Sequence, residues 1–213
     1  MLNVYSTFLS IQGESKYQGK PCFFVRLAGC GLHCSYCDSR EACESSGTTM
    51  SVSEVMDRII VSKVSLVEVT GGEPLMQQDT HLLLKTLADA YPKVLLETNG
   101  SLSVEQVDPR VHIVMDVKCP DSGMSDSFYL ENLLLLQDRP HELKFVIFSR
   151  DDFNWACSFV SEHGLNNREI TMSPVFEGVS LVQMAEWILS GPFPFRMQTQ
   201  LHKLIWPSGE KEF

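Results

Sequence analysis

The chain has 213 residues and a formal net charge of -10, from 17 Lys and Arg against 27 Asp and Glu. Hydrophobic residues make up 44% and charged residues 21%, as in an ordinary globular protein with a sizeable core. The acidic balance argues against partners that are nucleic acids or anionic membrane surfaces, because both attract Lys and Arg.

The first residues, MLNVYSTFLSIQGES, contain no Lys or Arg, so they do not resemble a signal peptide. No apolar run approaches the roughly 20 residues of a membrane-spanning helix. Seven cysteines are an odd number, which argues against a disulfide framework in this context. We therefore expect a cytoplasmic protein with reduced thiols and one domain over residues 1–213.

Strand-like and helix-like segments alternate along the rest of the chain. Strands are predicted at 22–28, 65–69, 93–97, 111–118, 142–148, 169–173 and 195–200. Helices are predicted at 51–61, 81–91, 151–164 and 180–191, with a capping box from Ser51 to Glu54 and a stop at Gly164. Segment 40–49 is polar and is expected to be a loop. The alternation predicts an α/β fold with parallel strands, and the small number of units predicts an incomplete TIM-like barrel.

Candidate catalytic or ligand-binding residues follow the first four predicted strands. In chain order they are the cysteines from Cys30 to Cys37, Gly71-Gly72-Glu73, Thr98-Asn99-Gly100, and Lys118. Since the carboxyl ends of parallel strands meet at one edge of a sheet, we expect these residues to share one site.

Three cysteines lie within eight positions, with spacing C-x3-C-x2-C. A zinc site with His33 or Cys43 as fourth ligand is one interpretation of Cys30, Cys34 and Cys37. Three buried cysteines without a ligand are another. The interpretation that we favour is an iron–sulfur cluster, in which three thiolates leave one iron open for chemistry.

The cysteine spacing with Tyr36 before the last cysteine resembles the signature of the radical S-adenosylmethionine (SAM) superfamily, and GGEP (71–74) resembles its second motif. The resemblance implies a [4Fe-4S] cluster on Cys30, Cys34 and Cys37 whose fourth iron binds SAM. It also implies SAM contacts from Tyr36, Gly72 and Glu73. Lys118 and Ser173 are candidates for further SAM contacts, and Asn99 is a candidate for SAM or the substrate. Each of these residues has the simpler interpretation of a strand end or a turn.

SIQGE (10–14), the segment GKPCFFVRLAGC (19–30), CDS (37–39) and QTQLHKLIWP (198–207) together resemble the 7-carboxy-7-deazaguanine synthase family. The resemblance implies a carbon–nitrogen lyase that converts 6-carboxy-5,6,7,8-tetrahydropterin to 7-carboxy-7-deazaguanine with loss of ammonia, in queuosine-type biosynthesis. It also implies Mg²⁺, an electron donor such as flavodoxin or ferredoxin, and a homodimer.

The pterin substrate presents an edge of N–H donors and a carboxylate, which require opposite partners. Glu14 and Gln12 offer acceptors for the edge, and the guanidinium of Arg26 suits the carboxylate. The predicted substrate site further includes Ile11, Gly13, Thr70, Asn99 and His202, with His202 also a candidate for proton transfer. Ser39 is the candidate Mg²⁺ ligand, where the family has Thr. An ordinary turn, a surface ion pair and a structural histidine are the simpler interpretations of residues 12–14, Arg26 and His202.

The sequence alone leaves two alternative functions open. Another small radical SAM enzyme, such as a glycyl-radical activase, would share the cluster but would not need Gln12 and Glu14. A zinc-binding interaction module would bind no iron.

Overall fold

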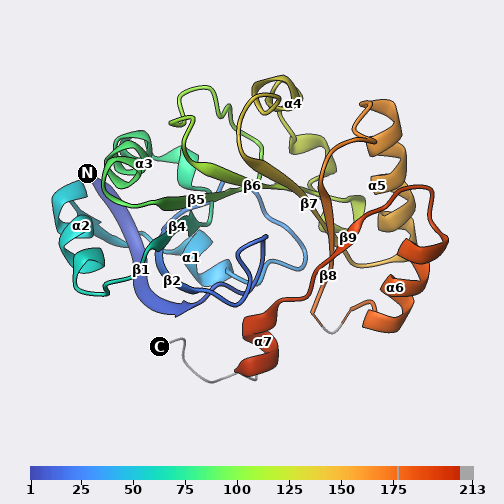
Figure 1. Ribbon diagram of the computed structural model, residues 1–213, viewed down its shortest axis with the longest axis horizontal. Helices are drawn as coiled ribbons and strands as arrows, with labels where there is room; N and C mark the ends of the chain where they lie inside the picture. Colours follow the sequence, from blue (N-terminus) through green and yellow to red (C-terminus); the bar gives the residue numbers. More distant parts are fainter. Residues whose placement is uncertain (177, 207–213) are drawn as a thin grey trace.

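The computed structural model describes residues 1–176 and 178–206; Pro207, at the end of the C-terminal motif, lies outside them. Its centre is a 9-stranded sheet in the order β3-β1-β2-β4-β5-β6-β7-β8-β9. The strands are β1 (Leu2–Ile11), β2 (Pro21–Leu27), β3 (Thr48–Met50), β4 (Leu66–Gly71), β5 (Lys93–Thr98), β6 (His112–Val117), β7 (His141–Ile147), β8 (Ile170–Pro174) and β9 (Arg196–Met197). The sheet curves without closing, which is the incomplete barrel that the sequence predicts (Figure 1).

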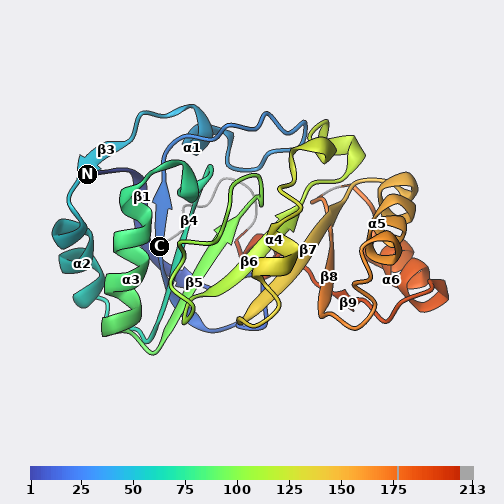
Figure 2. The same cartoon turned by 90° about the horizontal axis from the view of Figure 1, so that it is seen from above.

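The run β2-β4-β5-β6-β7-β8-β9 is parallel throughout. Strand β1 pairs antiparallel with both β2 and β3. The loops that follow β2, β4, β5 and β6 therefore leave from one edge of the sheet, which we call the rim. Figure 2 shows α1 and the segment after β2 along the same edge as the segment after β6. The polar residues that follow the first four predicted strands thus share one edge, as expected.

The helices are α1 (Arg40–Glu44), α2 (Val52–Ile60), α3 (Asp79–Ala90), α4 (Asn132–Leu135), α5 (Arg150–Glu162), α6 (Leu181–Ser190) and α7 (Leu201–Ile205). Figure 1 shows α2 to α6 around the outside of the curved sheet, with α7 on the opposite side. No helix in residues 1–176 or 178–206 is long and apolar enough to cross a membrane.

Side chains alternate between the two faces of the parallel strands, which separates the core from the interior of the barrel. Val69, Leu96 and Phe145 belong to the main core, which also includes Leu84 of α3 and Phe153 of α5. The neighbouring positions carry polar side chains on the other face: Glu68, Thr70, Glu97, Asp116, Lys144 and Ser173. The charged residues inside apolar strands therefore mark the inner face of the barrel.

The sequence misses the antiparallel strands β1 and β3. In β1 burial alternates only from Leu2 to Tyr5, and a register shift between Val4 and Ser6 breaks the period. The prediction of a loop over 40–49 is wrong in part, because α1 and the start of β3 lie there. The strand predicted over 195–200 is reduced to β9, whose two residues pair with β8.

The segment between β1 and β2, residues 12–20, crosses the opening opposite the rim, and we call it the floor loop. Backbone bonds from Gln12 N to Lys20 O and from Gly19 N to Gln12 O, both 2.8 Å, close it on itself. Lys16 N donates to Oε1 of buried Glu142 at 3.0 Å, and His112 Nε2 lies 2.8 Å from the same oxygen. The loop therefore closes the barrel at the amino ends of β6 and β7.

Helix α7 lies against the floor loop, where Leu201 N donates to Gly13 O at 3.0 Å. A Cβ at Gly13 would lie 1.9 Å from Nδ1 of His202, so only glycine allows this approach. Residues from the two ends of the described chain thus form adjoining walls of the interior.

The capping box of α2 is present as predicted: Ser51 Oγ accepts from Glu54 N at 3.2 Å, and Ser51 N donates to Glu54 Oε2 at 2.7 Å. Ser51→Ala should lower the free energy of unfolding by about 1 kcal/mol, because it leaves helix donors without an acceptor. Denaturant unfolding of the anaerobic protein measures this change. Exposed Ser53 in the same helix is the matched control, and an equal loss in Ser53→Ala would contradict the capping role.

Candidate active site

A cavity of about 570 Å³ opens at the rim and continues down to the floor loop. Its volume lies within the range of small-molecule sites, roughly 300–1,000 Å³. The residues predicted for the site that line it are Ile11, Gln12, Gly13, Glu14, Arg26, Cys30, Cys34, Tyr36, Cys37, Ser39, Thr70, Gly72, Asn99, Lys118 and His202. The structure therefore brings nearly the whole predicted site into one space, with Glu73 and Ser173 outside its lining.

The three cysteines of the motif line the upper part of this cavity, and Cys43 of α1 lines it too. Cys43 Sγ lies 3.8 Å from Cys37 Sγ, and Asn99 Nδ2 lies 3.7 Å from Cys30 Sγ. A cubane cluster takes its thiolates on different irons, so the cysteines need to face one space without converging on one atom. Cys30, Cys34 and Cys37 meet that requirement.

A single zinc ion makes a stricter demand, because four ligands must lie about 2 Å from one point. Within the described ranges, no three or more His, Cys, Asp and Glu side chains are grouped closely enough to hold one metal ion. His33 is not part of the cavity lining.

Gly72 brings the backbone after β4 against the cysteine loop. A Cβ at this position would lie 2.2 Å from Gly29 O and 2.8 Å from Cys30 Cβ. Gly72 N donates to Leu27 O at 3.1 Å, and Glu73 N donates to Gly29 O at 2.8 Å. The GGEP segment and the first cysteine are thus locked together, which leaves the backbone at Gly72 exposed to a ligand in the cavity.

Glu73 itself is 1% exposed, and its carboxylate is fully engaged within the protein. It accepts from Thr98 Oγ1 at 2.9 Å, Asn99 N at 2.8 Å and Leu75 N at 3.0 Å. Burial raises the pKa of Glu73, and these donors only partly oppose the shift. In this structure the carboxylate ties the ends of β4 and β5 together, and a direct SAM contact from Glu73 stays a prediction.

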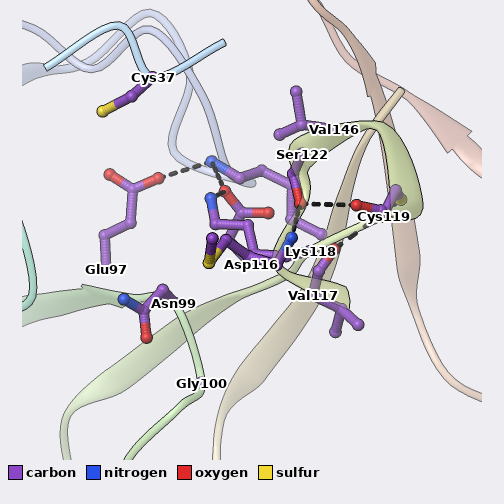
Figure 3. Close-up of polar contacts among 12 residues, drawn as sticks. Cys37, Glu97, Asn99, Gly100, Asp116, Val117, Lys118, Cys119, Ser122 and Val146 are labelled. Atoms are coloured by element: carbon purple, nitrogen blue, oxygen red, sulfur yellow. Dashed lines mark hydrogen bonds and ion pairs between the residues drawn. The ribbon is translucent and has the colours of Figure 1, made fainter. Parts of the chain in front are cut away.

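Lys118 and Asp116 form an ion pair at the end of β6, with Nζ 2.8 Å from Oδ2. Burial lowers the pKa of Lys118, but the Asp116 carboxylate outweighs it and raises the pKa above the ordinary value. The other oxygen, Asp116 Oδ1, is buried and has no hydrogen-bond partner among the described residues. Figure 3 shows Glu97, Asp116 and Lys118 turned toward one space across from Cys37. A ligand with an N–H or O–H donor would fit that orphan acceptor.

Tyr36 and Ser173 flank this region. Tyr36 donates from its hydroxyl to Val146 O at 3.2 Å and stacks on Phe148, with ring centroids 6.0 Å apart. Ser173 is 2% exposed and pairs in register with Val146, which lines the cavity. Ser173 is therefore on the inner face of the sheet, one strand beyond the cavity lining.

The floor loop brings its polar side chains to the bottom of the cavity. Gln12 donates from Nε2 to Glu68 Oε2, and Gln12 Oε1 accepts from Glu14 N at 2.9 Å. Glu68 is 4% exposed, and burial together with the negative charges of Glu97 and Glu14 raises its pKa well above the ordinary value. The amide of Gln12 is therefore fixed in orientation between Glu68 and the loop backbone.

Lys144 on β7 connects the acidic groups around the lower cavity. Its Nζ lies 2.7 Å from Glu14 Oε2, 2.6 Å from Glu97 Oε1 and 3.9 Å from Asp116 Oδ2, and its side chain is 5% exposed. Burial lowers the pKa of Lys144, but Glu14 and Glu97 raise it well above the ordinary value. The ammonium therefore stays charged and holds carboxylates from the floor loop, β5 and β6.

Arg26, near the carboxyl end of β2, is a further cation that lines the cavity. Its guanidinium carbon lies 5.9 Å from the centroid of Phe8, which itself stacks on Phe24. Within residues 1–176 and 178–206 Arg26 is in no ion pair. A guanidinium that lines a cavity without a carboxylate partner is available to an anionic group of a ligand.

Ser39 and Thr70 are two predicted hydroxyl-bearing residues that line the cavity. Ser39 Oγ donates to Asp38 Oδ1 at 3.2 Å, and Asp38 Oδ2 accepts from Lys203 Nζ at 2.8 Å. A hydroxyl beside a carboxylate is a set of hard oxygen donors that suits Mg²⁺. Thr70 Oγ1 donates to Glu97 Oε2 at 3.1 Å.

Comparison with known proteins identifies the family. The profile of the Radical SAM superfamily matches residues 25–110. A 7-carboxy-7-deazaguanine synthase from Chlorobaculum tepidum is 47% identical over 208 residues, covering 96% of this chain and 94% of that protein. The chain belongs to the 7-carboxy-7-deazaguanine synthase family. The synthases from Koribacter versatilis and Methanospirillum hungatei are 38% and 40% identical and each match 96% of this chain, covering 97% and 85% of those proteins.

Solved structures agree with this fold. A crystal structure of QueE from Escherichia coli is similar with a TM-score of 0.75 at 20% identity, covering 94% of both chains. Streptococcus suis SuiB bound to S-adenosylmethionine is similar with a TM-score of 0.56 at 14% identity, covering 86% of this chain and 51% of that chain. These structures show the same partial barrel, and the match to the Radical SAM superfamily gives the cofactors, a [4Fe-4S] cluster and SAM, as the motifs predict.

Sequence reasoning missed several charged residues of this synthase-family site. Glu68, Glu97, Asp116 and Lys144 all line the cavity from inside strands. A usable signal exists, because a charged side chain that alternates with apolar ones in a buried strand must face a polar interior. In ELKFVIF (142–148) the alternation of Lys144 with Leu143 and Phe145 is such a signal.

Replacing any of Cys30, Cys34 or Cys37 by Ala should abolish catalysis while the fold largely survives, because each variant removes one cluster ligand. Iron content and the broad brown absorbance of the anaerobically reconstituted protein measure the loss of the cluster, and a turnover assay measures the loss of catalysis. Cys157→Ala is the matched control, since Cys157 lies on α5 outside the cavity lining. Full activity in any of the three variants would refute the cluster assignment.

Gly72→Ala should also impair cluster assembly, because the added methyl group would overlap Gly29 O and Cys30 Cβ. We expect lower iron and sulfide content after reconstitution, with circular dichroism close to that of the native protein. Gly123→Ala is a suitable comparison, because no atom lies within 4 Å of its would-be Cβ, although its φ of +74° adds backbone strain. Normal cluster content in Gly72→Ala would show that this contact can relax.

Proposed function

We propose that this chain is a radical SAM lyase that converts 6-carboxy-5,6,7,8-tetrahydropterin to 7-carboxy-7-deazaguanine with loss of ammonia, in queuosine-type biosynthesis. The observation that carries the proposal is one cavity lined by the three cysteines at the rim, by Gln12 and Glu14 of the floor loop, and by Arg26 of β2. The identity of 47% to a named synthase over nearly the full length of both chains supports the same activity.

The cavity offers separate regions to cofactor and substrate. Cys30, Cys34 and Cys37 would hold the cluster, with SAM against Gly72 and beside Lys118 and Asn99. When bound, the cluster and SAM supply a carbon radical that abstracts a hydrogen atom from the substrate. The protein binds and orients both molecules and excludes competing reactants.

Substrate binding then depends on other side chains of the same cavity. Arg26 would bind the substrate carboxylate, because it is a cation without an ion-pair partner in the described chain. Gln12 and Glu14 would accept from the N–H edge of the pterin ring. Thr70, Asn99 and His202 line the same space, and we retain His202 as the candidate for proton transfer. Ser39 beside Asp38 would serve Mg²⁺.

The remaining predictions concern the setting of the enzyme. We propose that residues 1–213 act as one radical SAM domain in the cytoplasm, as a homodimer, with flavodoxin or ferredoxin as electron donor. We expect neither nucleic acid nor a membrane as partner.

An anaerobic turnover assay with 6-carboxytetrahydropterin, SAM, dithionite and Mg²⁺ tests the proposed reaction. Formation of 7-carboxy-7-deazaguanine and ammonia supports it. A glycyl-radical activase would instead cleave SAM without consuming the pterin, and either that result or a colourless, iron-free protein would contradict our assignment.

Glu14→Gln should weaken pterin binding while reductive cleavage of SAM persists, because the charge and an acceptor facing the substrate are lost but the cluster region is unchanged. We expect KM for the pterin to rise about tenfold, as for loss of one charge-assisted hydrogen bond. Steady-state kinetics with SAM-cleavage assays in parallel measure both effects. An unaltered KM would remove Glu14 from the substrate site.

A further inference from the structure

Glu97 on β5 is a cavity carboxylate that the family motifs do not cover. It lies beside Thr70 and Lys144 and lines the same space as the floor loop. Its side chain is 30% exposed, against 15% for Glu14, and the exposed part faces the cavity. Glu97 therefore presents more carboxylate surface to a ligand than Glu14 does.

Counting acceptor sites separates the two carboxylates. An ionised carboxylate has about four lone-pair sites, two on each oxygen. In the described chain Glu14 Oε2 accepts from Lys144 at 2.7 Å and Gln198 at 3.3 Å, and Oε1 accepts from Gln200 at 2.9 Å. Glu14 thus has room for a single further donor, on Oε1.

Glu97 differs from Glu14 in its unoccupied acceptor sites. Its Oε1 accepts from Lys144 Nζ at 2.6 Å, and its Oε2 accepts from Thr70 Oγ1 at 3.1 Å. Each oxygen keeps one site, so within the described residues Glu97 alone of this pair is able to accept two parallel N–H donors at once. That arrangement matches the guanidine-like edge of a pterin, where a ring N–H and the amino group point the same way.

Lys144 keeps Glu97 in the form that this contact requires. Burial raises the pKa of Glu97, but the charge and hydrogen bond of Lys144 outweigh it and bring the pKa below its ordinary value. The pKa of neighbouring Glu68 shifts in the opposite direction, because burial and the charge of Glu97 raise it. The ammonium of Lys144, 2.6 Å from Glu97 Oε1, therefore favours the charged form of the Glu97 carboxylate.

We propose that Glu97 is the carboxylate that binds the paired N–H donors of the pterin ring, and that Lys144 is the positioning residue that fixes it. The inference rests on the proposed function and adds a specificity residue to it. Glu14 then contributes one further acceptor at the same edge, and Arg26 binds the substrate carboxylate.

The test measures binding to the anaerobic holoenzyme by isothermal titration calorimetry. The probes are 6-carboxypterin, which carries the paired donors, and its analogue without the 2-amino group. The native enzyme should bind 6-carboxypterin about tenfold or more tightly than the analogue, since one charge-assisted hydrogen bond separates them. Glu97→Gln should bind both probes with nearly equal affinity, because one carboxylate oxygen becomes an NH2 donor and the side chain can no longer accept two parallel N–H donors.

Two further variants complete the experiment. Glu97→Asp keeps the charge beside Lys144 but retracts the carboxylate, so it should also lose discrimination between the probes. Glu162→Gln, at an exposed position of α5, is the matched control and should discriminate like the native enzyme. Reductive cleavage of SAM without pterin should continue in both Glu97 variants, since neither removes a cluster ligand.

Discrimination that survives in both Glu97 variants would overturn the inference, as would a native enzyme that binds both probes equally. Turnover of 6-carboxytetrahydropterin by the native enzyme separates that result from failure of the proposed function. If the native enzyme forms no 7-carboxy-7-deazaguanine, the proposed function fails and the role of Glu97 fails with it.

Discussion

Parallel hydrogen bonding from β2 to β8 holds the chemistry of this protein at one edge of the sheet. Because each strand leaves the sheet in the same direction, Cys30, Gly72, Asn99 and Lys118 emerge side by side although they span 89 positions of the sequence, from 30 to 118. The same pairing gives every strand one apolar and one polar face. Loss of that register would move the charged inner positions into the core, where they could not be hydrated.

The interior contains many charges, and its stability depends on how they are paired. Lys144 alone contacts Glu14 and Glu97 and lies near Asp116, and Lys118 takes the second contact to Asp116. Removing one member of such a buried set leaves the charges of the others uncompensated. This lowers the stability of the fold more than the loss of a surface ion pair does. The polar interior is therefore preorganised before any ligand binds, and a ligand meets fixed acceptors on Glu97 and Asp116.

Much of this arrangement could be predicted from the sequence, for physical reasons that also explain the rest. The parallel strands are short apolar runs bounded by turn residues, and the cysteine and GGEP motifs follow them directly, so the rim was predictable. Strand β1 was not, because its register shift near Val4 disrupts the alternation. The partnership of Glu14 with Lys144 was not either, since it joins residues 130 positions apart and depends on how the floor loop enters the barrel.

The contact between Gly13 and His202 has a consequence for chimeric enzymes. A methyl group at Gly13 would overlap the imidazole, so the floor loop and α7 have complementary shapes. A transplanted floor loop with any larger residue at position 13 would clash with His202, whereas transplanting the two segments together preserves their fit. The recombination unit for altering the bottom of the cavity is thus a pair of segments that are remote in sequence, and the rim with its cysteines can stay as it is.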